Sequence, residues 1–227
     1  MIIPNSAVRL LDMAQESYSG KAAVTDENES LTFEELRKLG LSIGTALSEC
    51  SDDEYMPEPV MVYLPKSCKC IASFMGAMYS GNPYVPIAYD MPSNRIQKIV
   101  DLLEGRGHII TDEAGMEIVK NMSIPDTMSI HIYSEIIGKI ADEKLVYSRL
   151  DKVIDTDPIY IMFTSGSTGE PKGVQVTYSN IDYFINWFSK KINMRNVNVL
   201  NQAAFSFDLS VADLYFSLFT GSTINII

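Results

Sequence analysis

The chain has 227 residues, of which 46% are hydrophobic and 21% charged, a composition typical of a folded globular protein with a substantial core. Its net charge of −11 argues against a general nucleic-acid surface and against an anionic-membrane surface, because both need basic patches. The N-terminus has no charged-then-apolar signal and no apolar run reaches ~18 residues, so we expect neither secretion by that route nor membrane insertion.

Cysteine and histidine are sparse. The odd set Cys50, Cys68 and Cys70 indicates reduced thiols and a cytoplasmic location. The two histidines, His108 and His131, stand far apart in β-prone runs, so we expect structural roles for both and no metal site.

Helical spacing of apolar residues alternates with short β-prone runs along the chain. Helices are predicted over residues 6–18, 34–50, 68–79, 93–103 and 113–121. Strands are predicted over residues 22–25, 30–33, 59–64, 84–87 and 108–111. This alternation predicts an α/β fold in three layers, with a mainly parallel sheet covered by helices on both faces.

The pattern is weaker after residue 121. Residues 129–137 have some strand character, and the charged residues 139–157 are predicted to form a surface excursion. Later elements are predicted as a helix starting at residue 179 or 180 and ending at 192, a strand over 197–200, a helix over 211–219 and a strand over 223–227. We expect the last strand to leave an open sheet edge that invites dimerisation.

The most informative stretch is Tyr160-Ile-Met-Phe-Thr-Ser-Gly-Ser-Thr-Gly-Glu-Pro-Lys-Gly173, which a β-prone run follows. Glycines let backbone N–H groups approach an anion closely, and successive N–H groups can form an anion-binding concavity. Hydroxyl groups can donate hydrogen bonds to the same anion, and a lysine adds a mobile positive charge. A strand, this loop and a second strand therefore predict a phosphate-binding hairpin.

Two other interpretations of this stretch fit the residues less well. A Walker A loop would need a second glycine where Pro171 stands and a hydroxyl residue in place of Gly173, so a P-loop NTPase is disfavoured. A flexible Gly/Ser linker fits the composition, but both flanks are apolar and are predicted to be neighbours in one sheet.

Four motifs together resemble the adenylate-forming (AMP-binding) superfamily. They are the signature loop Thr164–Gly173 and the segments Leu31–Leu36, Tyr84–Ile96 and Asn201–Val211, in the family's order. The last two segments resemble D-alanine–carrier protein ligases. The resemblance implies that residues 1–227 are the N-terminal portion of an amino-acid adenylation domain, with the C-terminal half of the family fold absent.

The resemblance also implies roles for individual residues. Thr164, Ser165 and Lys172 would contact the ATP phosphates, Lys172 with a catalytic role, and Mg²⁺ would accompany the nucleotide. The cradle would be shaped by Gly166, Ser167, Thr168 and Gly169. Asp208 would bind the α-ammonium group of the substrate, beside Phe207, although an aspartate ahead of a predicted helix can also be its N-cap.

The function implied by the resemblance is the ATP-dependent activation of an amino acid, D-alanine above all, as an aminoacyl adenylate. The acyl group would then pass to the phosphopantetheine thiol of a carrier protein. The alternatives left open are a nonribosomal peptide synthetase adenylation domain for another amino acid and a non-catalytic nucleotide-binding module. We expect the isolated fragment to be inactive.

Overall fold

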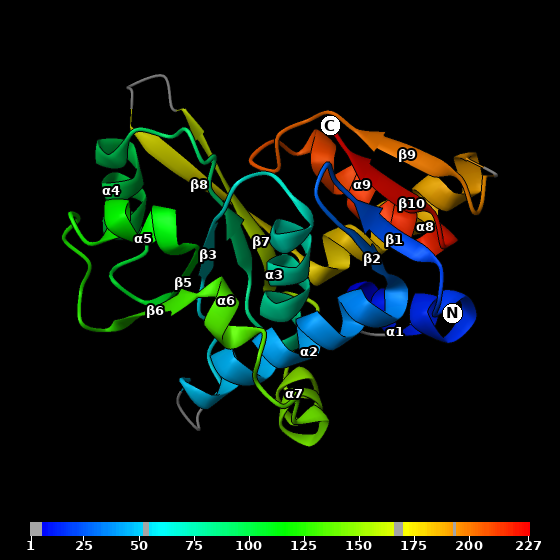
Figure 1. The fold of residues 1–227 in the computed structure, drawn as a ribbon, viewed down its shortest axis with the longest axis horizontal. Helices are drawn as coiled ribbons and strands as arrows, with labels where there is room; N and C mark the ends of the chain where they lie inside the picture. Colours follow the sequence, from blue (N-terminus) through cyan, green and yellow to red (C-terminus); the bar gives the residue numbers. More distant parts are fainter. Residues whose placement is uncertain (1–5, 52–54, 166–169, 193) are drawn as a thin grey trace.

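The strands form two sheets in a computed structural model that describes residues 6–51, 55–165, 170–192 and 194–227 (Figure 1). The six-stranded sheet has the order β6-β5-β3-β4-β7-β8. Its strands are β3 (Val60–Tyr63), β4 (Tyr84–Pro86), β5 (Gly107–Thr111), β6 (Met128–Ile132), β7 (Pro158–Ser165) and β8 (Pro171–Thr177). Neighbouring strands are parallel except for the antiparallel hairpin of β7 and β8.

Helices cover both faces of the six-stranded sheet. In β3, Val60 and Val62 belong to the core shared with α2 (Phe33–Glu49) and α3 (Cys68–Tyr79). The alternate residues Met61 and Tyr63 belong to a second core on the opposite face. That core includes side chains of α4 (Ser93–Leu102) and α5 (Glu113–Val119). The α/β class and the helical cover on both faces are confirmed.

The four-stranded sheet has the order β2-β1-β10-β9. It consists of β1 (Ala22–Thr25), β2 (Ser30–Thr32), β9 (Asn198–Asn201) and β10 (Thr223–Ile226). β10 pairs in parallel with β1 on one side and β9 on the other. The expectation of an open edge at 223–227 is therefore wrong, because this strand is an interior strand of its sheet.

The helices α1 (Ser6–Tyr18), α2, α3, α8 (Tyr178–Lys191) and α9 (Leu209–Thr220) contribute to the core that joins the two sheets. One close approach in it is between α2 and α3, where Gly76 of α3 meets Ile43 of α2. A Cβ atom at Gly76 would lie 2.3 Å from Cγ2 of Ile43, so only glycine permits this approach. Among the described residues, none of the helices is both long enough and apolar enough to cross a membrane.

Residues 139–157 are not a surface excursion. They contain α7 (Glu143–Leu150), in which Val146 and Leu150 are buried against the core, and a short helix, α6 (Tyr133–Ile136), precedes it. The sequence analysis did not predict this partly buried helix, because only one of its faces is apolar and the exposed charges dominate the stretch.

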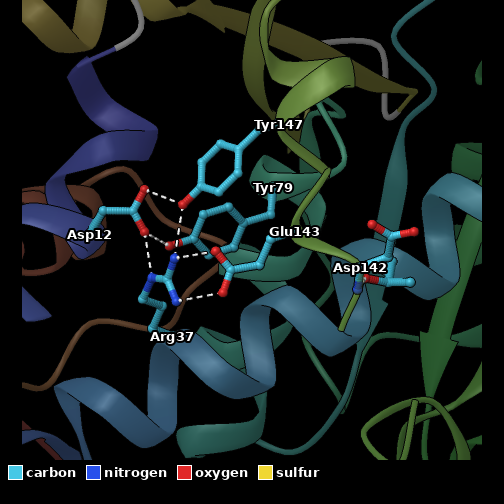
Figure 2. A network of polar contacts seen from close by, with 7 residues as sticks. Asp12, Arg37, Tyr79, Asp142, Glu143 and Tyr147 are labelled. Atoms are coloured by element: carbon cyan, nitrogen blue, oxygen red, sulfur yellow. Dashed lines mark hydrogen bonds and ion pairs between the residues drawn. The ribbon is translucent and has the colours of Figure 1, made fainter. Parts of the chain in front are cut away.

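A polar network fixes α7 to the rest of the fold (Figure 2). The Arg37 guanidinium donates to Asp12 of α1 at 2.7 Å and to Glu143 of α7 at 3.1 Å. The hydroxyl groups of Tyr79 and Tyr147 donate to the same Asp12 carboxylate at 2.7 and 2.9 Å. Asp12, Arg37 and Tyr147 each have two or more partners in this network, so four helices are held in one arrangement.

Candidate functional site

A cavity of about 610 Å³ opens beside the β7–β8 hairpin. One wall consists of Tyr160, Met162 and Thr164 from β7 and of Val174 and Val176 from β8. The hairpin register pairs Tyr160 with Val176 and Met162 with Val174, so these side chains leave the same face of the two strands.

Lys172 is placed on that face by the same register. It lies directly opposite Thr164, and side chains of directly opposed residues project from one face. Lys172 is exposed, and Thr164 lines the cavity. The two strands predicted to flank the loop are observed as the β7–β8 hairpin. Lys172 is a residue of β8 rather than a residue ahead of the second strand, and it is not among the residues that line the cavity.

The tip of the hairpin lies outside the described residues. Gly166, Ser167, Thr168 and Gly169 fall in it, and so does the side chain of Ser165, the last residue of β7. The cradle predicted for these residues stays a prediction.

The opposite walls of the cavity come from two other parts of the chain. Phe207 and Asp208 belong to the segment that precedes α9, and Asp90 and Arg95 come from the turn after β4 and from the first part of α4. Thr164 and the adjacent residues Phe207 and Asp208, which lie more than 40 positions further along the sequence, thus line one cavity.

Asp208 is exposed, and its side chain makes no capping hydrogen bond to α9. Its backbone is already helical, with φ −60° and ψ −25°, whereas a capping aspartate has an extended backbone. The capping interpretation is therefore not supported. Burial and the nearby Asp208 charge together raise the pKa of Tyr160 to about 12, so this phenol stays neutral at physiological pH.

Lys66 was missed by the sequence analysis. It follows β3, and its ammonium group donates to the backbone carbonyls of Asn201 at 2.8 Å, Gln202 at 3.2 Å and Ile227 at 2.9 Å. It also lies 5.8 Å from the ring centroid of Phe205. One side chain therefore joins the six-stranded sheet to the ends of β9 and β10, and it fixes the start of the segment that leads to Asp208. The available signal was its position at the carboxyl end of a buried parallel strand, where sites of α/β folds lie.

A second cavity of about 290 Å³ adjoins the first at Asp90 and Ser206. It lies at the carboxyl ends of β3 and β4, and Lys66 and Cys70 line it. Burial raises the pKa of the Cys70 thiol to about 12, so this residue is not a nucleophile at neutral pH.

One group of side chains in the described part of the chain has the spacing of a metal site. Ligand atoms of Asp26, Glu29 and Cys68 lie within 4.8 Å of one another. The Asp26 carboxylate already accepts hydrogen bonds from the backbone N–H groups of Asn28, Glu29 and Cys68. Burial and the Asp26 carboxylate raise the pKa of the Cys68 thiol well above its ordinary value, which opposes the thiolate form that binds metals. This donor set does not suit a metal.

Comparison with known proteins gives a consistent family. The sequence model of AMP-binding enzymes matches residues 11–227. A D-alanine–D-alanyl carrier protein ligase of Listeria welshimeri is 36% identical over 199 residues, and one of Bacillus velezensis is 34% identical over 203 residues. Each alignment covers 86% of this chain and 37% of the relative, so the chain spans little more than a third of their length.

A similar fold is found in a crystal structure of a nonribosomal peptide synthetase, FmoA3, in its AMPPNP-bound form. The TM-score is 0.81 at 19% identity, and the match covers all of this chain and 23% of the other.

Proposed function

The chain belongs to the AMP-binding enzyme family, and from this premise we propose that it is the N-terminal portion of the adenylation domain of an AMP-forming amino-acid ligase. The observation that carries the proposal is that Thr164 of the β7–β8 hairpin and Asp208 line the same cavity. A hairpin that binds phosphate, in one cavity with a carboxylate that binds an ammonium group, suits a reaction between ATP and an amino acid.

The phosphates of ATP are assigned to the hairpin wall. Thr164 supplies a hydroxyl donor, and Lys172 supplies a charge on the same face of the hairpin. Ser165 and the residues from Gly166 to Gly169 would complete the cradle. Mg²⁺ carried by the triphosphate would neutralise part of its charge during the reaction.

The amino acid is assigned to the wall formed by Phe207 and Asp208. The exposed Asp208 carboxylate makes no cap, so it is available to the α-ammonium group of a substrate. D-Alanine is the proposed substrate, because the curated relatives at 34–36% identity are D-alanine–D-alanyl carrier protein ligases.

In the proposed reaction, a carboxylate oxygen of the amino acid forms a bond to the α-phosphorus of ATP, and the bond from that phosphorus to pyrophosphate breaks. Lys172 and the hydroxyl of Thr164 stabilise the negative charge that moves onto the leaving pyrophosphate. The thiol of a carrier protein's phosphopantetheine then attacks the acyl carbon, loses its proton and displaces AMP. The residues of this chain act by positioning and electrostatics.

The test is amino-acid-dependent exchange of labelled pyrophosphate into ATP, measured on a ligase that contains this chain. A panel of D-alanine, L-alanine, glycine and larger amino acids separates the possibilities. Exchange that depends on D-alanine is expected. Exchange with another amino acid alone would favour a synthetase module, and ATP binding without exchange under any amino acid would favour a non-catalytic module.

A further inference from the structure

The geometry points to Arg95 as a further substrate-binding residue, one that binds an anionic oxygen group in the 610 Å³ cavity. This inference deepens the proposed function and rests on it for the identity of the substrates. In the sequence this arginine is one residue of the Tyr84–Ile96 motif, and the sequence analysis assigns it no ligand.

The position of Arg95 aims it at the hairpin. It lies in the first turn of α4, three residues before Lys98 and therefore on the same side of the helix. Lys98 forms an ion pair of 2.8 Å with Glu170, immediately before β8. Arg95 itself lines the cavity together with Thr164 and Asp208.

Arg95 lacks a partner in the part of the chain that the structure describes. Its Nε atom is buried and makes no hydrogen bond, and no ion pair joins its guanidinium to Asp90 or Asp208, the carboxylates of the same cavity. Arg37, by contrast, is paired with Asp12, Glu143 and Tyr147. A buried N–H group without a partner is unfavourable, and a ligand that accepts from it removes that cost.

The chemistry of the guanidinium defines the missing partner. Its planar array of donors matches the paired oxygens of a phosphate or a carboxylate, and it remains charged at every physiological pH. In this cavity two sources offer such oxygens: the phosphates of ATP and the carboxylate of the amino acid. Arg95 would hold that group in the cavity that Thr164, Phe207 and Asp208 also line.

The experiment measures binding of sodium pyrophosphate, ATP and D-alanine to the 227-residue chain by isothermal titration calorimetry. Arg95→Gln removes the charge, Arg95→Lys keeps the charge but not the paired donors, and Arg106→Gln removes an exposed arginine from the loop after α4 as a matched control. We expect Arg95→Gln to weaken binding about 10- to 100-fold, the range for a lost charged hydrogen bond. Arg95→Lys should weaken it less, and Arg106→Gln should leave it unchanged.

The probes identify the source of the anion. A loss with pyrophosphate and ATP assigns Arg95 to phosphate, and a loss with D-alanine alone assigns it to the carboxylate. Unchanged affinities for all three probes in Arg95→Gln, or no binding of any probe by the wild-type chain, would overturn the inference.

Thermal unfolding without ligand separates binding from a structural role. Arg95→Gln removes a buried donor that has no partner, so the melting temperature should stay the same or rise. A lower melting temperature with unchanged affinities would show a structural residue. If pyrophosphate binding depends on Arg95 but the ligase shows no amino-acid-dependent exchange, the inference stands and the proposed function fails. If the ligase shows amino-acid-dependent exchange but ligand binding does not depend on Arg95, the proposed function stands and the inference fails.

Discussion

At the scale of the residue, Asp208 has two candidate roles, a helix N-cap and a substrate-binding carboxylate. The sequence left its cap and substrate roles open, and the structure shows an exposed side chain with no capping hydrogen bond. We therefore predict that Asp208→Ala changes the free energy of unfolding by less than about 0.5 kcal/mol, as for an ordinary surface site. In an active ligase the same change should lower kcat/KM for the amino acid by roughly 10- to 100-fold, with a much smaller effect on the KM for ATP.

The control for Asp208 is Asp126→Ala, which removes another exposed carboxylate that does not line the cavity. A loss of about 1 kcal/mol of stability in Asp208→Ala with normal amino-acid kinetics would restore the capping role and end the substrate role.

Lys172 carries the second residue prediction. It is exposed at a strand position opposite Thr164, so Lys172→Ala should leave the fold intact. In an active ligase it should raise the activation barrier by about 2–4 kcal/mol, the range for one preorganised charge-stabilising donor, which is a rate loss of roughly 30- to 1,000-fold. Pyrophosphate exchange measures the effect, and Lys144→Ala in α7 is the matched exposed control. Normal exchange in folded Lys172→Ala would exclude the lysine from the reaction.

The sequence could suggest only residues that lie within continuous motifs. Thr164, Lys172 and Asp208 became candidates because their immediate neighbours carry a recognisable pattern, and their roles stay predictions. Lys66 and Arg95 received no site role from the sequence, because they are distinguished by their surroundings in the folded structure. Lys66 is distinguished by three backbone carbonyls at the ends of β9 and β10, and Arg95 by the lack of a partner among the described residues. Neither feature is encoded near the residue itself.

At the scale of the element, pairing of β5 with β6 brings together the two histidines that are 23 residues apart in the sequence. Nδ1 of His108 lies 3.1 Å from Nε2 of His131, and the other ring nitrogen of His108 lies 3.4 Å from the Glu58 carboxylate. Burial, with a smaller effect of the adjacent His108, lowers the pKa of His131 to about 4. The His108 ring holds the pKa of Glu58 below its ordinary value.

This pair makes the fold sensitive to acid. His131 titrates near pH 6.5 in the unfolded chain and near pH 4 in the folded one, so the unfolded state binds more protons between these values. Its contribution to stability is full above pH 6.5 and is lost as the pH falls to 4, at most about 3 kcal/mol. The lowered pKa of Glu58 acts in the same direction. Urea unfolding at pH 7 and pH 4.5 should show the loss, and His131→Gln should reduce it; an equal loss in the variant would contradict the assignment.

The elements themselves were largely predictable, and their pairing was not. The predicted helix over 68–79 matches α3 residue for residue, because its apolar spacing and the following glycine are local signals. The division of the strands into two sheets is not a local property, since periodicity does not say which strands are neighbours. The same limit explains α7, which contacts Asp12 and Arg37 from distant parts of the chain through Glu143 and Tyr147.

At the scale of the whole molecule, one core runs from the first helix to the last strand. It contains Leu11 of α1, Phe74 of α3 and Ile224 of β10, and it joins both sheets. β10 is held between β1 and β9, and Lys66 connects the ends of β9 and β10 to the six-stranded sheet. Such continuity favours an independently folded chain, with cooperative unfolding rather than separate melting of the two sheets.

The chain should nevertheless fold without being catalytically active. We predict that the purified 227-residue chain unfolds cooperatively but shows no amino-acid-dependent pyrophosphate exchange above background, and binds ATP only weakly. The cavity combines Thr164, Asp208 and Arg95, yet the chain spans 37% of the length of its curated ligase relatives. Binding energy from remote parts of a substrate positions its reacting atoms, so the loss of those contacts lowers the rate as well as the affinity. Fluorescence-monitored unfolding and an exchange assay on the same preparation test both halves. Robust exchange with D-alanine would mean that the hairpin, Asp208 and Arg95 suffice to position the α-phosphate, which would place the whole chemical step within these 227 residues.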